Sequence, residues 1–166
     1  HWLGLAMPRI YSLILALAAA AALLACAELP ATGGHAGHSH GGAPDTRQFV
    51  KFPEEMRIGT LTHMRDHLLA LSEIQGALAA ERYAEAADIA ENRLGMSSLK
   101  LHGAHDVSKF MPKGMQDTGT AMHRSASRFA IAAQNSAATG DAKPALAALT
   151  EVTRACVACH AGYRIQ

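Results

Sequence analysis

The chain is poor in cysteine, in aromatic side chains and in net charge. Its 166 residues include three cysteines, and aromatic residues make up 5% of the composition. Three cysteines cannot build the network of several disulfides that stabilises small secreted domains. The 15 basic and 14 acidic side chains nearly balance. This balance argues against a nucleic-acid-binding surface, so nucleic acid is not a predicted partner.

The sequence also lacks sustained alternation of β-branched residues, whereas alanine is abundant. Alanine has the highest intrinsic helix propensity, and β-strands favour β-branched and aromatic residues. The composition therefore predicts an all-α fold. At this length we expect one domain with accessory segments.

Two of the three cysteines stand close together near the C-terminus, in the run Cys156-Val157-Ala158-Cys159-His160. On a helix, side chains three and four positions apart share one face, so both thiols and the imidazole are expected to point the same way. Two thiols can then bond to the vinyl groups of one porphyrin while the imidazole reaches its iron, and this spacing is the attachment signature of c-type haem. The sequence predicts one covalent haem c on Cys156 and Cys159, with His160 as an axial ligand.

Other uses of two cysteines at this spacing fit the chain less well. A thioredoxin-like redox pair lies in a βαβ context and has no role for the histidine. A structural zinc site needs a second pair of ligands, and no second cysteine pair exists. A helical interaction domain that carries the motif by coincidence is a third interpretation. We find no activated nucleophile or carboxylate pair, so an enzyme is not predicted.

The segment from Cys156 to Arg164, CVACHAGYR, resembles the C-terminal signature of the cytochrome c prime family, the class II c-type cytochromes. The resemblance covers residues 49–166 and implies an antiparallel four-helix bundle with the haem on its last helix. It implies that Tyr163 and Arg164 contribute to the haem environment, with Arg164 beside the proximal imidazole. The implied function is electron transfer, or binding of nitric oxide or carbon monoxide at the iron. Implied partners are periplasmic or membrane redox proteins and a second copy of the chain.

The segment from Arg57 to Leu68 resembles the first helix of that family. Matched residue by residue, it places Leu61 over the iron and Arg57 near the haem propionates. A leucine cannot ligate, so this match implies a five-coordinate iron with an apolar distal pocket. A shift of one turn would instead put Met64 on the iron, as in the low-spin relatives of the family. Core packing is the other interpretation of Met64.

The spacing of apolar residues predicts four helices. The first begins near Pro53, the second runs from Tyr83 to about Leu94, the third ends near Gly140, and the fourth begins after Asp141. The first helix is predicted to bury a stripe of Leu61, Met64, Leu68, Leu71 and Leu78. The last is predicted to bury Leu146, Leu149, Val152, Cys156, Cys159 and Tyr163.

Several histidines lie outside these stripes. His63 and His67 are predicted to be exposed or partly buried, and His123 to lie on the surface. His102 and His105, three positions apart, can supply two ligands to a surface metal site, which is too few for a site of their own.

Residues 1–26 are predicted to be a lipoprotein-type export signal whose natural start is Met7. Arg9 precedes an apolar run from Ile10 to Leu24 that is too short for a comfortable membrane span. The run ends at Cys26 in a sequence that looks like a lipobox, so Cys26 is predicted to be lipidated. Cleavage at a nearby alanine, or retention as an anchor, is the alternative. We expect a periplasmic protein held to the membrane by lipid.

Residues 27–48 are rich in Gly, Ala, Pro and Thr, which predicts a flexible linker before the domain at residues 49–166. The linker contains His35, His38 and His40, three imidazoles within six residues that can chelate copper or zinc. A histidine-rich tether without metal is the other interpretation. If the tract captures metal, the alternative function is a periplasmic metal-handling lipoprotein with a haem redox centre.

Overall fold

The structure is a computed structural model, and it describes residues 44–166. The predicted export signal, the predicted lipidation site at Cys26 and the three linker histidines lie outside the described residues. The chain divides into two units, His1–Pro44 and Asp45–Gln166, and the second contains the haem motif. The described residues are mostly helical with almost no strand, which confirms the all-α prediction. None of the helices in this part of the chain is long and apolar enough to cross a membrane.

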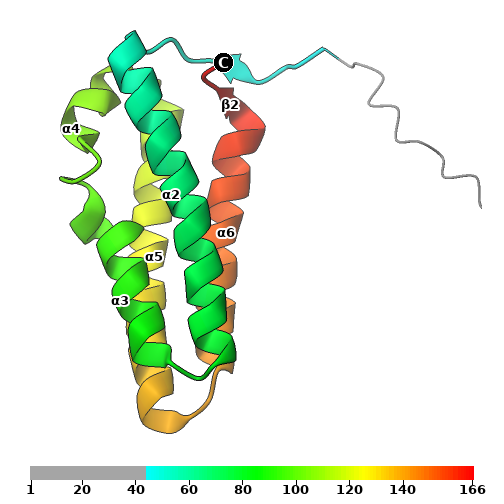
Figure 1. The fold of residues 1–166 in the computed structure, drawn as a ribbon. Helices are drawn as coiled ribbons and strands as arrows, with labels where there is room; N and C mark the ends of the chain where they lie inside the picture. Colours follow the sequence, from blue (N-terminus) through cyan, green and yellow to red (C-terminus); the bar gives the residue numbers. More distant parts are fainter. Residues whose placement is uncertain (1–43) are drawn as a thin grey trace, which may run out of the picture. The chain divides into compact units, whose positions relative to one another are not determined.

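Four helices of the second unit run alongside one another: α2 (Glu54–Ala79), α3 (Tyr83–Arg93), α5 (Lys113–Thr139) and α6 (Lys143–Gly162) (Figure 1). Helix α5 packs on both α6 and α3, and α3 also packs on α2. The backbones of α2 and α6 come close at few positions. The connection from α3 to α5 contains two 3₁₀ turns, Met96–Ser98 and Ser108–Phe110, and the short helix α4 (Ala104–Val107).

The segment before α2 is joined to the chain's last residues. Strand β1 (Gln48–Phe49) pairs in parallel with strand β2 (Tyr163–Arg164), so that Gln48 lies opposite Tyr163. The Val50 N–H extends this pairing by donating to the Arg164 carbonyl oxygen over 2.8 Å. The start of α2 and the end of α6 therefore lie at the same end of the unit, as Figure 1 shows, and these two helices run in opposite directions.

The ends of the helices follow from local chemistry and agree with the sequence predictions. Pro53 immediately precedes α2, where its missing N–H leaves no hydrogen bond unmade. Helix α5 ends at Gly140, whose φ of 75° lies in the left-handed region that glycine adopts without strain. The Asp141 carboxylate then accepts a hydrogen bond of 3.0 Å from the Lys143 N–H, and Pro144 occupies the first turn of α6.

The main core contains many alanines and few large side chains. The large side chains that are fully buried are Phe129, Ile74, Leu94 and Val152. Alanines on all four helices are almost completely buried: Ala70, Ala77, Ala86, Ala87, Ala90, Ala126, Ala133 and Ala145. Small side chains let the helices approach closely but remove little apolar surface from water.

The predicted apolar stripes are partly wrong. Leu68 on α2 is 71% exposed and Leu146 on α6 is 51% exposed. The residue before each, His67 and Ala145, is buried instead. An amphipathic helix can carry two neighbouring stripes that are suited to burial. Here the stripe with the smaller side chains is buried, because small side chains let the neighbouring helices pack closely. The buried residues of α2 are Thr60, His67, Ala70, Ile74, Ala77 and Leu78.

Candidate functional site

The haem motif lies in the last two turns of α6, which continues to Gly162. The Cys156 and Cys159 side chains are half-buried, and neither forms a disulfide. Cys156 packs against the edge of the main core. Cys159 packs against a second apolar cluster built around Val50, Phe52 and Met115. Two thiols one helical turn apart are therefore held against apolar surroundings.

Burial raises the pKa of the Cys156 thiol, and burial together with the neighbouring Cys156 raises the pKa of Cys159. Both thiols are therefore protonated at neutral pH. A thioredoxin-like redox pair needs the opposite effect, because its attacking sulfur must be a thiolate. The surroundings of the two cysteines thus argue against a free redox dithiol.

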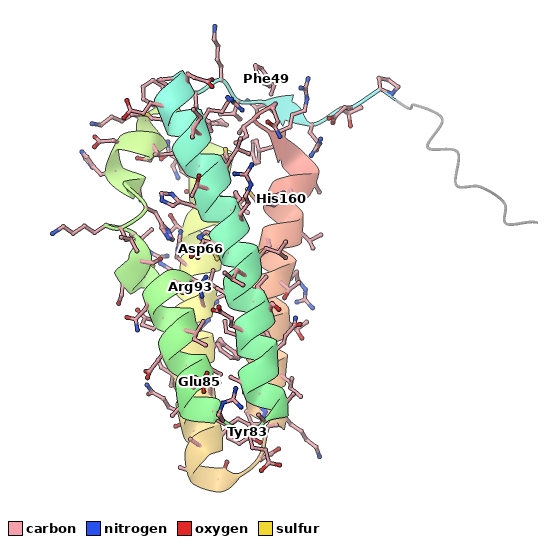
Figure 2. The ribbon with its side chains drawn as sticks, in the orientation of Figure 1. Phe49, Asp66, Tyr83, Glu85, Arg93 and His160 are labelled. Atoms are coloured by element: carbon pink, nitrogen blue, oxygen red, sulfur yellow. The ribbon has the colours of Figure 1, made fainter. Side chains whose placement is uncertain are left out.

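His160, which follows Cys159 directly, is exposed near the end of α6 (Figure 2). Its backbone carbonyl accepts a hydrogen bond from the Arg47 guanidinium over 3.5 Å. Its imidazole has no hydrogen-bond partner among residues 44–166. The ring is therefore free to ligate a metal.

Comparisons of the chain with protein-family models, curated proteins and solved structures find no match. The function must therefore be inferred from the side chains and their surroundings.

The predicted distal residues, Leu61 and Met64, are both half-buried on α2. Asp66 lies on the flank of α2 that faces α3, because its carboxylate accepts hydrogen bonds from Arg93 of α3, one of them 3.1 Å long (Figure 2). Leu68 is two positions from Asp66 and thus on nearly the opposite side of the helix. Leu61, Met64 and Leu68 share that side, so α2 has an apolar flank turned away from α3 and incompletely covered.

Arg57 lies near the start of α2, at the end that carries the haem motif. Its guanidinium forms two hydrogen bonds with Glu54, of 2.7 and 2.9 Å. It also donates to the Gln166 side chain over 3.3 Å. The Arg57 guanidinium therefore lies close to the end of the chain, within reach of an anionic group bound beside α6.

The two residues after α6 contact the segment before α2. Tyr163 is half-buried in the second apolar cluster. The Arg164 guanidinium lies 5.1 Å from the centroid of the Phe49 ring and 3.5 Å from the Asp45 carboxylate. These contacts anchor Arg164 to the strand that covers the chain end.

The structure corrects the predictions for two histidines. His67 is 8% exposed and His123 is 9% exposed, so both are buried instead of lying on the surface. The ring of His102, which the sequence paired with His105, lies beside the rings of His63 and His67. The only sequence signal for this arrangement is the four-residue spacing of His63 and His67, which puts both on one helix face.

Proposed function

We propose that the chain is a monohaem c-type cytochrome of the cytochrome c prime type, with α2, α3, α5 and α6 as an antiparallel four-helix bundle. One observation carries the proposal. Cys156 and Cys159 are free, half-buried thiols one turn apart on α6, followed directly by the imidazole of His160, which has no hydrogen-bond partner among residues 44–166. This is the arrangement that attaches haem c. When bound, the haem supplies one-electron transfer and an iron that can bind small diatomic molecules.

The residues around the motif fit a large flat apolar group. Cys156 and Cys159 would hold the porphyrin, and His160 would ligate the iron. Leu61, Met64 and Leu68 would be covered, and full burial of one leucine side chain contributes about 1.5–3 kcal/mol. Leu68 of this flank is exposed in the absence of such a group, so a haem against it would remove apolar surface from water.

Two side chains compete for the position over the iron. We propose that Leu61 occupies it, as the resemblance implies, and that Met64 packs beside it. The sixth coordination position is then open to nitric oxide or carbon monoxide. Arg57 is proposed to face the haem propionates, since its guanidinium already reaches the end of the chain. Electrons are exchanged with periplasmic or membrane redox proteins, and lipid at Cys26 holds the protein to the membrane.

The test is expression of the full chain in cells equipped for c-type haem maturation. We expect a coloured protein in which the peptide that contains Cys156 and Cys159 carries the mass of one haem, which denaturation does not release. The variant Cys156→Ala/Cys159→Ala should lose this mass. Cys26→Ser is the matched control, because it removes a cysteine outside the motif and should retain the haem. A colourless wild-type chain with two free thiols at positions 156 and 159 would contradict the proposal.

A further inference from the structure

Four histidines from three separate elements meet where α2, α5 and the connection between α3 and α5 come together. They form the histidine cluster: His63 and His67 of α2, His102 of the connection between α3 and α5, and His123 of α5. The ring centroid of His102 lies 4.7 Å from that of His63 and 4.9 Å from that of His67. The His123 centroid lies 5.7 Å from that of His102 and 6.0 Å from that of His67.

These four separations are close to those of imidazoles that share one metal ion. With zinc–nitrogen bonds of about 2.0–2.1 Å in tetrahedral geometry, two rings on one ion have centroids about 5 Å apart. Two of the observed centroid separations are shorter than this value and two are longer. Core packing alone does not require imidazoles, because aliphatic side chains fill a core without burying polar atoms.

Two ring nitrogens in the cluster point to a ligand. The Nε2 atom of buried His67 has no hydrogen-bond partner among the described residues. A buried polar atom normally has one, so an orphan of this kind calls for an explanation such as a bound ion. His123 has the second feature, because its Nδ1 lies 2.7 Å from the Leu94 carbonyl oxygen. A carbonyl can only accept, so Nδ1 carries the proton and Nε2 is left with a lone pair, as in metal-bound histidines.

We propose that the histidine cluster binds one transition-metal dication of the kind that imidazole favours, zinc or copper. Four neutral nitrogen donors without a carboxylate suit these ions and not calcium or magnesium, which require oxygen ligands. The site goes beyond the haem proposal and is independent of it, because none of its residues belongs to the motif at positions 156–160.

In the structure as it stands, no three donor atoms of His, Cys, Asp or Glu among residues 44–166 converge tightly enough to hold an ion. The backbone and the first side-chain torsion set the positions of the rings. The positions of the nitrogens also depend on the second torsion, which is broad for histidine. Rotation of the rings in place can bring the nitrogens together without moving a helix.

The four donors are imidazoles, which carry no negative charge, and the Asp66 carboxylate next to His67 in the chain is already paired with Arg93. A bound ion would tie the connection that carries His102 to both α2 and α5.

The test uses the full haem-loaded chain in a background with His35, His38 and His40 replaced by alanine, because that tract can itself chelate metal. Zinc and copper(II) are titrated against a chromophoric chelator, with magnesium as the negative control. We expect one zinc or copper ion per chain and no magnesium. His67→Ala/His102→Ala should bind more than about 100-fold more weakly, since loss of even an outer-shell partner costs 10–100-fold. His105→Ala, an exposed histidine of the same connection, should bind as before.

A second variant guards against a folding defect in the double mutant. His63→Gln changes a half-buried cluster residue and should weaken binding while leaving the helical circular dichroism intact. X-ray absorption at the zinc edge should show nitrogen ligands at about 2.0–2.1 Å and no sulfur. Absence of stoichiometric binding in the tract-free chain would overturn the proposal, and so would unchanged affinity in both cluster variants. The haem absorption, read from the same samples, reports separately on the motif at α6.

Discussion

Leu61 and Met64 lie within one turn of each other on α2, and only Met64 carries an atom that can ligate iron. Both side chains are half-buried in the described part of the chain, so burial does not choose between them. If the chain carries haem as proposed, the choice would decide the chemistry at the metal, because a thioether in the sixth position closes the iron to diatomic ligands. A single side chain would then separate an electron carrier from a gas-binding cytochrome.

We predict that the ferrous wild-type protein binds carbon monoxide readily and that its ferric form is high-spin. Met64→Leu should change neither property, because Met64 is proposed to pack beside the iron without ligating it. Leu61→Met should make the protein low-spin and slow carbon monoxide uptake, since it supplies a ligand. Optical spectra with and without carbon monoxide measure all three proteins. A low-spin wild type that becomes high-spin in Met64→Leu would show that the assignment of Leu61 is wrong.

Helix α5 ends at a glycine in left-handed backbone. Its last turn passes into Gly140, whose backbone is left-handed, and the Gly140 N–H donates to the Ser136 carbonyl oxygen over 2.8 Å. Gly76 lies in the last turn of α2, where its φ is not positive, and a Cβ added there would meet nothing within 4 Å. The same residue type thus has opposite effects at the two positions.

Gly140→Ala is predicted to lower the free energy of unfolding by about 1–2 kcal/mol, because an L-residue is strained in left-handed backbone. Gly76→Ala is the matched control and is predicted to raise it by about 0.5–1 kcal/mol, since alanine favours helix. Urea denaturation of the two haem-loaded variants measures both changes. Equal changes of the same sign would contradict the reason given for the end of α5.

The segment before α2 belongs to the end of the unit that carries Cys159, although it has little regular structure. Phe52 is 6% exposed and belongs to the apolar cluster that contains Cys159 and Tyr163. Strand pairing with the chain end holds the segment in place. The cluster therefore joins the start of the domain to the haem motif.

Phe52→Ala is predicted to destabilise the protein by about 3–5 kcal/mol, which is usual when a buried phenylalanine is truncated. Phe110→Ala is the control, because Phe110 is 42% exposed and most surface substitutions change stability by less than about 0.5 kcal/mol. Thermal or urea melts followed by circular dichroism compare the two. Similar losses in both variants would mean that Phe52 does not anchor this end of the domain.

At the scale of the whole molecule, the second unit buries many alanines and exposes several large apolar side chains. Leu68 is 71% exposed, while the fully buried side chains larger than alanine are few. Folding must offset a conformational entropy loss of about 1–2 kcal/mol per residue, and small side chains contribute little to that. A bound porphyrin would supply the missing apolar contact.

We therefore predict that the wild-type chain made without haem maturation folds poorly, because haem binds the native state and stabilises it by linkage. The haem-free chain should show reduced helical circular dichroism and a broad melt, and the haem-loaded chain a cooperative one. Near-native helicity with a cooperative melt in the haem-free chain would show that the helices pack stably by themselves.

The sequence by itself determined the features that depend on near neighbours. The helix ends at Pro53 and Gly140 and the start of the last helix after Asp141 are each written within a few residues. Steric and hydrogen-bonding preferences of the backbone act over that same short range, which is why these predictions agree with the structure.

Three features were decided only by the tertiary structure. They are the side of α2 that is buried, the pairing of the segment before α2 with the end of the chain, and the meeting of four histidines. Leu68 is the more apolar residue and His67 the more polar, yet His67 is buried, because the neighbouring helices pack against the stripe of smaller residues. Whether a side chain is buried depends on which parts of the other helices pack against it. The rings of His102 and His123 come from positions far along the chain, and no local pattern records their meeting.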